Sequence, residues 1–434
     1  MIQMTIQTKI GDMDKSLKDK SVIIIDNGSH IGFAQRLSRE IGTIYYHNPS
    51  GKSSYPAEHD AAVGEGLEGI IVSYDFWDDL KKCDAVFFLD LYHDDWQEHL
   101  VSLGYPVWGA KEGEEIETER IEAKKLMRRL GLPVNKYDIV IGMDKLREYL
   151  KNNEDVFVKV SRWRGDGETF HSENYQAIES KLNHLQVFYG AMADKKEFCV
   201  EKPIDAVCEV GLDLYCIDGQ FPEIVPFGYE IKDMGYACTV KPYKDLSPLL
   251  TDLPNKFADT MRNLQYRSDF STEHRITKKK VSYCIDIVAG RKPSPPSELL
   301  QELISNWGEI MFHGAAGKMI QPEYEAKFGV EIIIHCTEAE KEWVTIQVPE
   351  EIRRWVKLKN VCYYNDAFQY IPQSFEMEEI GAVVAIGASL DECVEKVREY
   401  CSMIIGHGLE MNTDSIIDKL QKQIDNGESI GIEF

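Results

Sequence analysis

The first hydrophobic segment of the chain is a short apolar run at residues 21–26, SVIIID, followed by a polar loop and a helical pattern from Ile31. An apolar run of this length predicts a strand buried on both faces, and the order strand, loop, helix opens a βαβ unit. The segment DAVFFLDLYHDDW from Asp84 repeats this order. We therefore predict an open parallel α/β domain, with His93 near the carboxyl edge of its sheet, where a capping or surface role is favoured over catalysis.

The middle of the chain predicts paired strands. VFVKV at 156–160 is an apolar run with one lysine, and FCVEKPIDAVCEV at 198–210 contains two hydrophobic runs. DFSTEHRITKKKVSYCIDIV at 269–288 reads as two strands joined by a basic turn. SELLQELISNWGEIMFHG then predicts one helix with Ser297 as its N-cap. Short strands follow, closed by a helix from Leu390 onward, and they predict a small mixed domain.

Composition and charge limit the number of domains, the kinds of partner and the cellular compartment. The chain has 434 residues, 43% of them hydrophobic, which suits two or three domains. A net charge of −24 disfavours nonspecific binding to nucleic acid or to an anionic membrane. The ten cysteines are scattered singles that read as small buried residues in a reducing compartment. With neither a signal-peptide pattern nor a run of membrane-helix length, we expect a soluble, cytoplasmic protein.

The strand at 156–160 carries Lys159 and runs into a loop containing Gly165 and Gly167. A lysine within an apolar strand is costly unless its ammonium meets a partner, and phosphate oxygens suit such a compact charge. Glycines let backbone N–H groups approach those oxygens. The segment therefore predicts a phosphate-binding hairpin, with a hairpin whose lysine points to solvent as the alternative.

The next segment places Glu201 after a hydrophobic run and Glu209 at the start of another. A nucleotide base needs a backbone donor and a carboxylate or carbonyl for its amino group, and ribose hydroxyls donate to a second carboxylate. We predict that Glu201 and Glu209 fill these two roles. The alternative is that both glutamates are solvated strand-end residues.

Two acidic residues follow on neighbouring predicted strands, Glu273 and Asp286. Their carboxylates can converge in an antiparallel pair, and Mg²⁺ bound beside phosphates takes one or two protein carboxylates. Asp286 lies among apolar residues, where a charge is expensive without such a role. This pair predicts a site for Mg²⁺, with Mn²⁺ as an alternative ion.

This order of parts resembles the ATP-grasp superfamily. The segment TERIEAKKLMRRLGLPV is similar to the helix that precedes the first ATP-grasp strands in phosphoribosylamine–glycine ligases and biotin carboxylases, where a basic residue contacts phosphate; Arg120 matches that position and Lys124 follows one turn later. The resemblance implies an α/β (α+β) chain with the ATP-grasp fold, between an N-terminal open parallel α/β domain and a small C-terminal mixed domain. The implied divisions are 1–115, 116–325 with two lobes and a hinge near 201–204, and 326–434.

The resemblance also implies a function. ATP-grasp ligases join a small carboxylate to an amine through an acyl phosphate, with ATP and Mg²⁺. Arg291 and Lys241 are the catalytic candidates, and Arg291 matches the family's phosphate-contacting arginine after a one-residue slip. In the site that the resemblance implies, Glu201 and Ile204 orient adenine and Glu209 binds the ribose. Neither substrate is named by the sequence, which also leaves open whether the chain forms a homodimer.

Two departures from the family pattern bear on activity. Val288 stands where many members carry a metal-binding asparagine, and Pro203 has no N–H to offer adenine. They motivate an alternative, a noncatalytic nucleotide-binding scaffold descended from a ligase. A kinase-like phosphotransferase on the same fold is a further alternative.

Overall fold

The computed structural model describes residues 16–49, 62–161, 169–292, 295–372 and 379–434. The chain begins with a parallel five-stranded sheet in the order β3-β2-β1-β4-β5, which confirms the predicted open α/β region. Helices cover it, and His93 is the N-cap residue of α4 without a side-chain cap bond. The bounds are β1 Ser21–Ile25, α2 Ile31–Leu37, β2 Thr43–His47, β3 Ile70–Val72, α3 Phe76–Leu80, β4 Ala85–Phe88, α4 Asp94–Ser102 and β5 Val107–Trp108.

Two helices, α5 Glu115–Thr118 and α6 Arg120–Arg129, lead to a four-stranded antiparallel sheet, the small lobe, in the order β6-β9-β7-β8. Two helices pack on one face of this sheet and enclose a separate hydrophobic core. Val158 and Phe198 belong to that core, so the period of two puts Lys159 and Cys199 on the opposite face. The bounds are β6 Tyr137–Ile141, α7 Met143–Asn152, β7 Val156–Val160, β8 Thr169–Ser172, α8 Tyr175–Tyr189 and β9 Glu197–Glu201.

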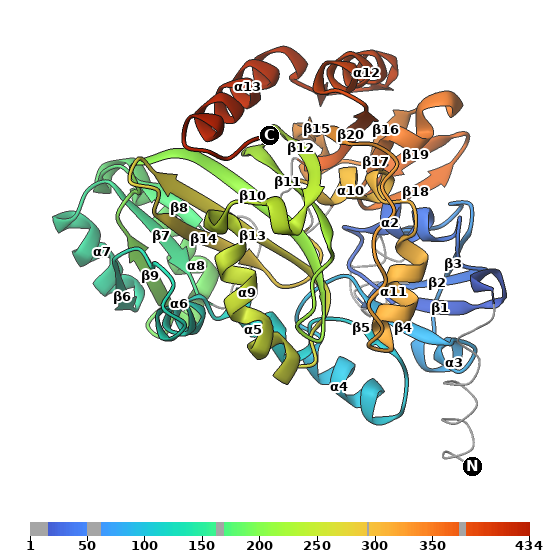
Figure 1. The fold of residues 1–434 in the computed structure, drawn as a ribbon, viewed down its shortest axis with the longest axis horizontal. Helices are drawn as coiled ribbons and strands as arrows, with labels where there is room; N and C mark the ends of the chain where they lie inside the picture. Colours follow the sequence, from blue (N-terminus) through green and yellow to red (C-terminus); the bar gives the residue numbers. More distant parts are fainter. Residues whose placement is uncertain (1–15, 50–61, 162–168, 293–294, 373–378) are drawn as a thin grey trace.

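A nine-stranded sheet, the large sheet, forms the centre of the molecule (Figure 1), in the order β14-β13-β10-β11-β12-β15-β20-β17 with β22 paired to β15. The sheet contains strands from both sides of residue 325, the predicted end of the ATP-grasp region, because β12 pairs with β15. The bounds are β10 Ala206–Ile217, β11 Ile224–Ile231, β12 Gly235–Pro242, α9 Pro248–Asn263, β13 Arg267–Thr277, β14 Ser282–Val288, β15 Phe328–Cys336, β17 Val356–Leu358, β20 Glu379–Gly387 and β22 Leu409–Glu410.

The last part of the chain adds a second four-stranded sheet, β18-β19-β16-β21, and two helices that pack on the large sheet. All ten cysteines lie within the described residues, where each is buried, as predicted. Within those residues no helix has the length and apolar character needed to cross a bilayer. The bounds are β16 Val344–Gln347, β18 Val361–Tyr364, β19 Ala367–Tyr370, α12 Leu390–Met403, β21 Ile405–Gly406 and α13 Thr413–Ser429.

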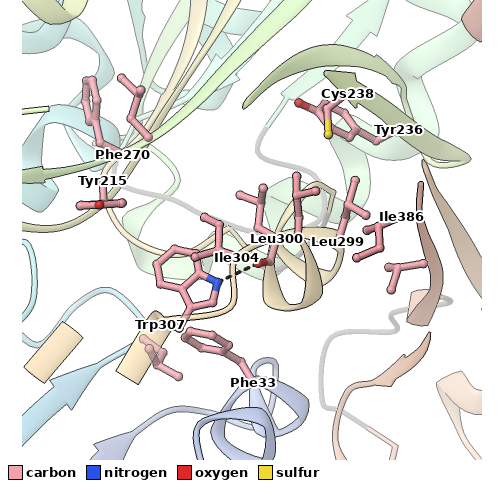
Figure 2. Close-up of a cluster of buried hydrophobic side chains, with 14 of the residues drawn as sticks. Phe33, Tyr215, Tyr236, Cys238, Phe270, Leu299, Leu300, Ile304, Trp307 and Ile386 are labelled. Carbon is pink, nitrogen blue, oxygen red and sulfur yellow. Dashed lines mark hydrogen bonds between the residues drawn. The ribbon is translucent and has the colours of Figure 1, made fainter. Parts of the chain in front are cut away.

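The single helix predicted from Ser297 is wrong in detail. The segment forms two helices, α10 Ser297–Leu303 and α11 Trp307–Ala315, and Pro296 rather than Ser297 is the N-cap residue of α10. The break is stabilised by Asn306, whose side chain donates to the carbonyl of Gln321 at 3.0 Å. Leu300 and Trp307 still lie together across the break, since the Trp307 indole N–H donates to the Leu300 carbonyl (Figure 2).

These two helices join the parallel sheet to the large sheet. Figure 2 shows Trp307 between Phe33 of α2 and Tyr215 of β10, and the rings of Phe33 and Trp307 meet edge to face at 5.5 Å. All three belong to one hydrophobic core cluster. The parallel sheet is therefore fixed to the large sheet through a continuous core, whereas the small lobe has a core of its own.

Candidate functional site

Charged residues from the small lobe, α6 and β14 line one pocket, whose empty space, part of it open to solvent, is about 320 Å³. Lys159 and Asp286, predicted from strands more than a hundred residues apart, both line it, as do Arg120 and Lys124 of α6. Apolar side chains complete the lining, among them Met127, Ile285 and Ile287. We call this hollow the lobe pocket.

Lys159 is buried, and its ammonium donates to the backbone carbonyl of Ile285 at 2.5 Å. Burial lowers the pKa of this lysine, while the Glu201 carboxylate acts in the opposite direction. Lys159 therefore bridges the small lobe and the strand predicted to bind metal. A buried cation held by a carbonyl and neighbouring acids is well placed to bind an anion.

Lys124 and Glu201 form a buried ion pair at 3.0 Å, and Asn135 adds a long hydrogen bond of 3.5 Å to the same carboxylate. Burial raises the pKa of Glu201, but Lys159 and Lys124 outweigh it and hold the pKa below its usual range. The carboxylate is therefore charged at neutral pH. It lies at the end of β9, and residues 202–205 connect it to β10 of the large sheet.

Arg120 donates to Asp286 at 2.9 Å. The Arg120 side chain is 8% exposed and the Asp286 side chain 33% exposed. Burial raises the pKa of Asp286, but Arg120 and Lys159 outweigh it and keep the carboxyl ionised. The predicted phosphate cation and one predicted metal ligand thus neutralise each other in this structure.

Glu273 lies directly opposite Asp286 across β13 and β14, so both side chains are on one face of the large sheet. They line a second hollow of about 430 Å³, the acidic pocket, together with Glu209, Asp213, Glu230, Lys292 and others. Glu209 pairs with Arg275 at 2.5 Å. Burial raises the pKa of Glu273, and the neighbouring carboxylates of Glu230 and Glu209 raise it further.

Two opposed carboxylates fit a Mg²⁺ ion that keeps water and phosphate as its other ligands. Among the described residues, no three His, Cys, Asp or Glu side chains converge in a metal-binding arrangement. Glu273 and Asp286 alone would therefore hold such an ion weakly, and a bound nucleotide would supply its remaining ligands.

No family model and no curated protein matches the sequence, but solved structures match its fold. Phosphoribosylamine–glycine ligase from Thermotoga maritima matches with a TM-score of 0.66 at 15% identity, over 91% of this chain and 99% of that one. This chain has the ATP-grasp fold. Biotin carboxylase from Campylobacter jejuni, in its β,γ-ATP complex, matches with a TM-score of 0.63 at 14% identity, over 94% of this chain and 96% of that one. L-amino acid ligase from Bacillus licheniformis matches with a TM-score of 0.58 at 16% identity, over 91% of this chain and 98% of that one.

Other predicted site residues of the ATP-grasp region lie elsewhere. Gly165 and Gly167 fall outside the described residues. The Ile204 carbonyl accepts from the Ala206 N–H at 2.9 Å within the link between lobes. Lys241 donates to the carbonyl of Glu433 at 2.7 Å, near the end of the chain, and lines neither pocket.

Arg291 also lines neither pocket. Its guanidinium lies 3.5 Å from the ring centre of Phe33 and 5.0 Å from that of Trp307, and it pairs with Asp269 at 3.2 Å. The side chain is 1% exposed. Arg291 is thus packed into the core that joins the parallel sheet to the ATP-grasp strands.

Sequence reasoning missed the polar residues on the same face of the large sheet as Glu273. Asp213, Glu230 and Tyr236 line the acidic pocket, and the Tyr236 hydroxyl donates to Asp213 at 2.6 Å. Each interrupts an apolar strand with the correct period of two, which is a usable signal. Their convergence depends on strand order, which the sequence pattern does not specify.

A second missed group lies at the carboxyl end of β1 in the parallel sheet. The buried Asp26 carboxylate accepts from the backbone N–H groups of Gly28 and His30 and from the Tyr46 hydroxyl at 2.6 Å. Burial raises the pKa of Asp26 to about 6 despite these bonds. Strand order reverses between β1 and β4, so this carboxyl is at the place where open α/β sheets bind ligands.

Proposed function

We propose that this protein is an ATP-dependent carboxylate–amine ligase that forms an amide or peptide-like bond through an acyl phosphate. The observation that carries the proposal is the convergence of Arg120, Lys124, Lys159 and Asp286 on one pocket between two sheets. Glu201 is paired with Lys124, and Glu273 lies beside Asp286. These residues come from separate segments, and each has the chemistry that a nucleotide requires at that point. The fold match to ligases supports the reaction class.

In this proposal the lobe pocket binds ATP. Lys159 and Arg120 neutralise phosphate oxygens, and Lys124 holds the Glu201 carboxylate in place through its ion pair. Glu201 and Ile204, in the link between lobes, contact adenine, and Glu209 contacts ribose. Gly165 and Gly167, which lie outside the described residues, are proposed to contact phosphate as well.

Glu273 and Asp286 would hold Mg²⁺, or Mn²⁺ in its place, against the phosphates. When bound, the ion supplies positive charge that neutralises the triphosphate. Because Asp286 is paired with Arg120, nucleotide phosphate must draw Arg120 away before the carboxylate turns to a metal. Binding of nucleotide and of metal should therefore be coupled.

The reaction depends on positioning of the substrates and does not require a nucleophile from the protein. A substrate carboxylate oxygen forms a bond to the γ-phosphorus while the bond to the ADP oxygen breaks. The amine nitrogen then attacks the acyl carbon, inorganic phosphate leaves, and the nitrogen loses a proton. The protein contributes cations, correct alignment and exclusion of water.

The proposal also covers substrates, localisation and oligomeric state. The carboxylate and the amine are small molecules, the protein works in the cytoplasm, and a homodimer is compatible with the proposed function. Arg291 and Lys241 receive no catalytic step, since neither lines the pockets.

The alternative is a noncatalytic nucleotide-binding scaffold. Val288 lines the acidic pocket where many ATP-grasp ligases carry a metal-binding asparagine, and Pro203 lies in the link between lobes. Both features reduce the polar groups available to a nucleotide and its metal. They favour this second function over a kinase-like one.

Phosphate release from ATP with Mg²⁺ tests the proposal, with pooled amino acids, other carboxylates and amines as substrates. We expect release that requires both a carboxylate and an amine and that falls at least a hundredfold in Asp286→Asn. Asp259→Asn, at an exposed position on α9, is the matched control and should leave the rate unchanged. ADP binding by calorimetry without release from any pool would favour the scaffold, and absence of ADP binding would reject both.

A further inference from the structure

The acidic pocket contains a cation that belongs to the protein. Five carboxyl groups line it, from Glu209, Asp213, Glu230, Glu273 and Asp286, and Lys292 is the lysine among the lining residues. The Lys292 ammonium donates to Glu230 at 2.6 Å, with side chains 25% and 18% exposed. Lys292 comes directly after Arg291, which is anchored in the core by Asp269 and two aromatic rings. That anchor fixes where the lysine enters the pocket.

Strand register explains why the carboxyl groups gather there. Glu273 pairs with Asp286 on one side and with Gly211 on the other, and Gly211 pairs with Gly228. Directly opposite residues share a face of the sheet, so these four positions form one row across four strands. Asp213 and Glu230, each two residues along its strand from a glycine of the row, lie on the same face.

Gly211 and Gly228 leave the end of this row farther from Asp286 without side chains of its own. A Cβ at Gly211 would meet nothing closer than 3.8 Å, so the space above it is open to another group. The ammonium of Lys292 enters this region from the loop after β14. Burial lowers its pKa, but Glu230, Glu273 and Asp213 outweigh this effect and raise the pKa above its ordinary value, so the lysine is charged.

Lys292 also acts on both predicted metal ligands. Its charge lowers the pKa of Glu273 and that of Asp286, although burial and other neighbours contribute more to each. Val288, which replaces the usual asparagine, lies on the same face and lines the same pocket. One polar ligand is therefore replaced by an apolar side chain, and a protein cation lies among the acids that remain.

We propose that the Lys292 ammonium takes the place of a second divalent cation, so that the chain binds a single Mg²⁺ or Mn²⁺ together with nucleotide. The inference rests on the proposed function, since a tightly bound divalent cation is expected here beside nucleotide phosphates. In this arrangement Lys292 neutralises Glu230 and Asp213, while Glu273 and Asp286 hold the one metal ion. The pocket keeps its charge balance without the asparagine that Val288 replaces.

Counting bound Mn²⁺ tests this, with free Mn²⁺ measured by electron paramagnetic resonance with and without ADP. With ADP we expect one Mn²⁺ per wild-type chain and two per Lys292→Met chain, because removal of the ammonium frees Glu230 and Asp213 for an ion. Lys292→Arg keeps the charge and should stay at one. Lys244→Met, at an exposed position outside the pocket, is the matched control and should also stay at one.

Two Mn²⁺ per wild-type chain would overturn the inference, as would an unchanged count in folded Lys292→Met. If Lys292→Met does not fold, the wild-type and Lys292→Arg counts still decide, since either count at two rejects the proposal. Calorimetry of ADP is run in parallel. If no form binds ADP, the proposed function fails, while the difference in Mn²⁺ count between Lys292→Met and wild type without ADP still tests the role of Lys292.

Discussion

Arg120 and Asp286 lie 166 positions apart in the sequence and form an ion pair at 2.9 Å in the lobe pocket. One is expected to bind phosphate and the other a metal ion, so each occupies the other in the absence of ligand. The pair stores opposite charges at the site without leaving either one unpaired in a largely buried place. When phosphate binds Arg120 and a metal ion binds Asp286 together, the net charge of the site changes little.

Arg120→Gln should therefore have opposite effects on the two ligands. The variant should bind ADP about tenfold more weakly, because a charge-assisted contact worth roughly 1.4 kcal/mol is lost. It should bind Mn²⁺ alone about fivefold more tightly, because a cation beside Asp286 is removed. Calorimetry with each ligand measures both, and Arg129→Gln, exposed on the same helix, is the control. A loss of affinity for both ligands would contradict the ion-pair argument.

Arg291→Met should act on stability rather than on ligand binding. Its loss leaves the buried Asp269 without its ion-pair partner and removes the cation beside the rings of Phe33 and Trp307, which should cost about 3–5 kcal/mol in the free energy of unfolding. Urea denaturation measures this cost, and the added change Asp269→Asn should restore part of it. Near-normal stability with loss of ADP binding would instead support the catalytic role predicted from the sequence.

Local sequence patterns predicted which strands carry the site residues, but they predicted less well where the nearby helices begin and end. The apolar runs around Lys159 and Asp286 predicted β7 and β14, because a single charge does not interrupt a strand with the correct period. Ser297 was misread as a cap, since the Asn306 break that divides the helix depends on a contact with Gln321, a residue beyond both helices. Arg291 and Lys292 are neighbours in sequence, yet one enters the core and the other the acidic pocket. That division depends on the packing of Phe33, which lies on a distant helix.

Gly28→Ala should destabilise the junction between the parallel sheet and the turn at Asn360. Gly28 has a φ of 110°, and a Cβ there would lie 1.9 Å from the Asn360 side-chain oxygen. We expect a loss of about 2–3 kcal/mol in the free energy of unfolding, from backbone strain and overlap together. Asn360 itself has a φ of 49°, so Asn360→Gly is compatible with its backbone. The double variant should recover the part due to overlap. Thermal and urea unfolding measure both steps, and no recovery would show that strain at Gly28 accounts for the whole loss.

Asp26 should make stability depend on pH in a defined direction. Its pKa is raised from 3.8 in the unfolded chain to about 6 in the fold, mainly by burial. The folded state therefore holds a proton that the unfolded state releases, so the contribution of this group is complete below pH 4 and is lost as pH rises through 6. Between pH 4.5 and 7.5 the loss should be about 2 kcal/mol, from roughly 1.4 kcal/mol per unit of pKa shift.

Asp26→Asn removes this titration and should make the unfolding free energy change less between pH 4.5 and 7.5 than in the wild type, by that same amount. Asp259→Asn, which alters an exposed carboxyl on α9, should leave the wild-type dependence in place. Urea denaturation at the two pH values measures all three proteins. An equal pH dependence in Asp26→Asn and wild type would mean that Asp26 is ionised throughout, with its bonds from Gly28, His30 and Tyr46 outweighing the cost of burial.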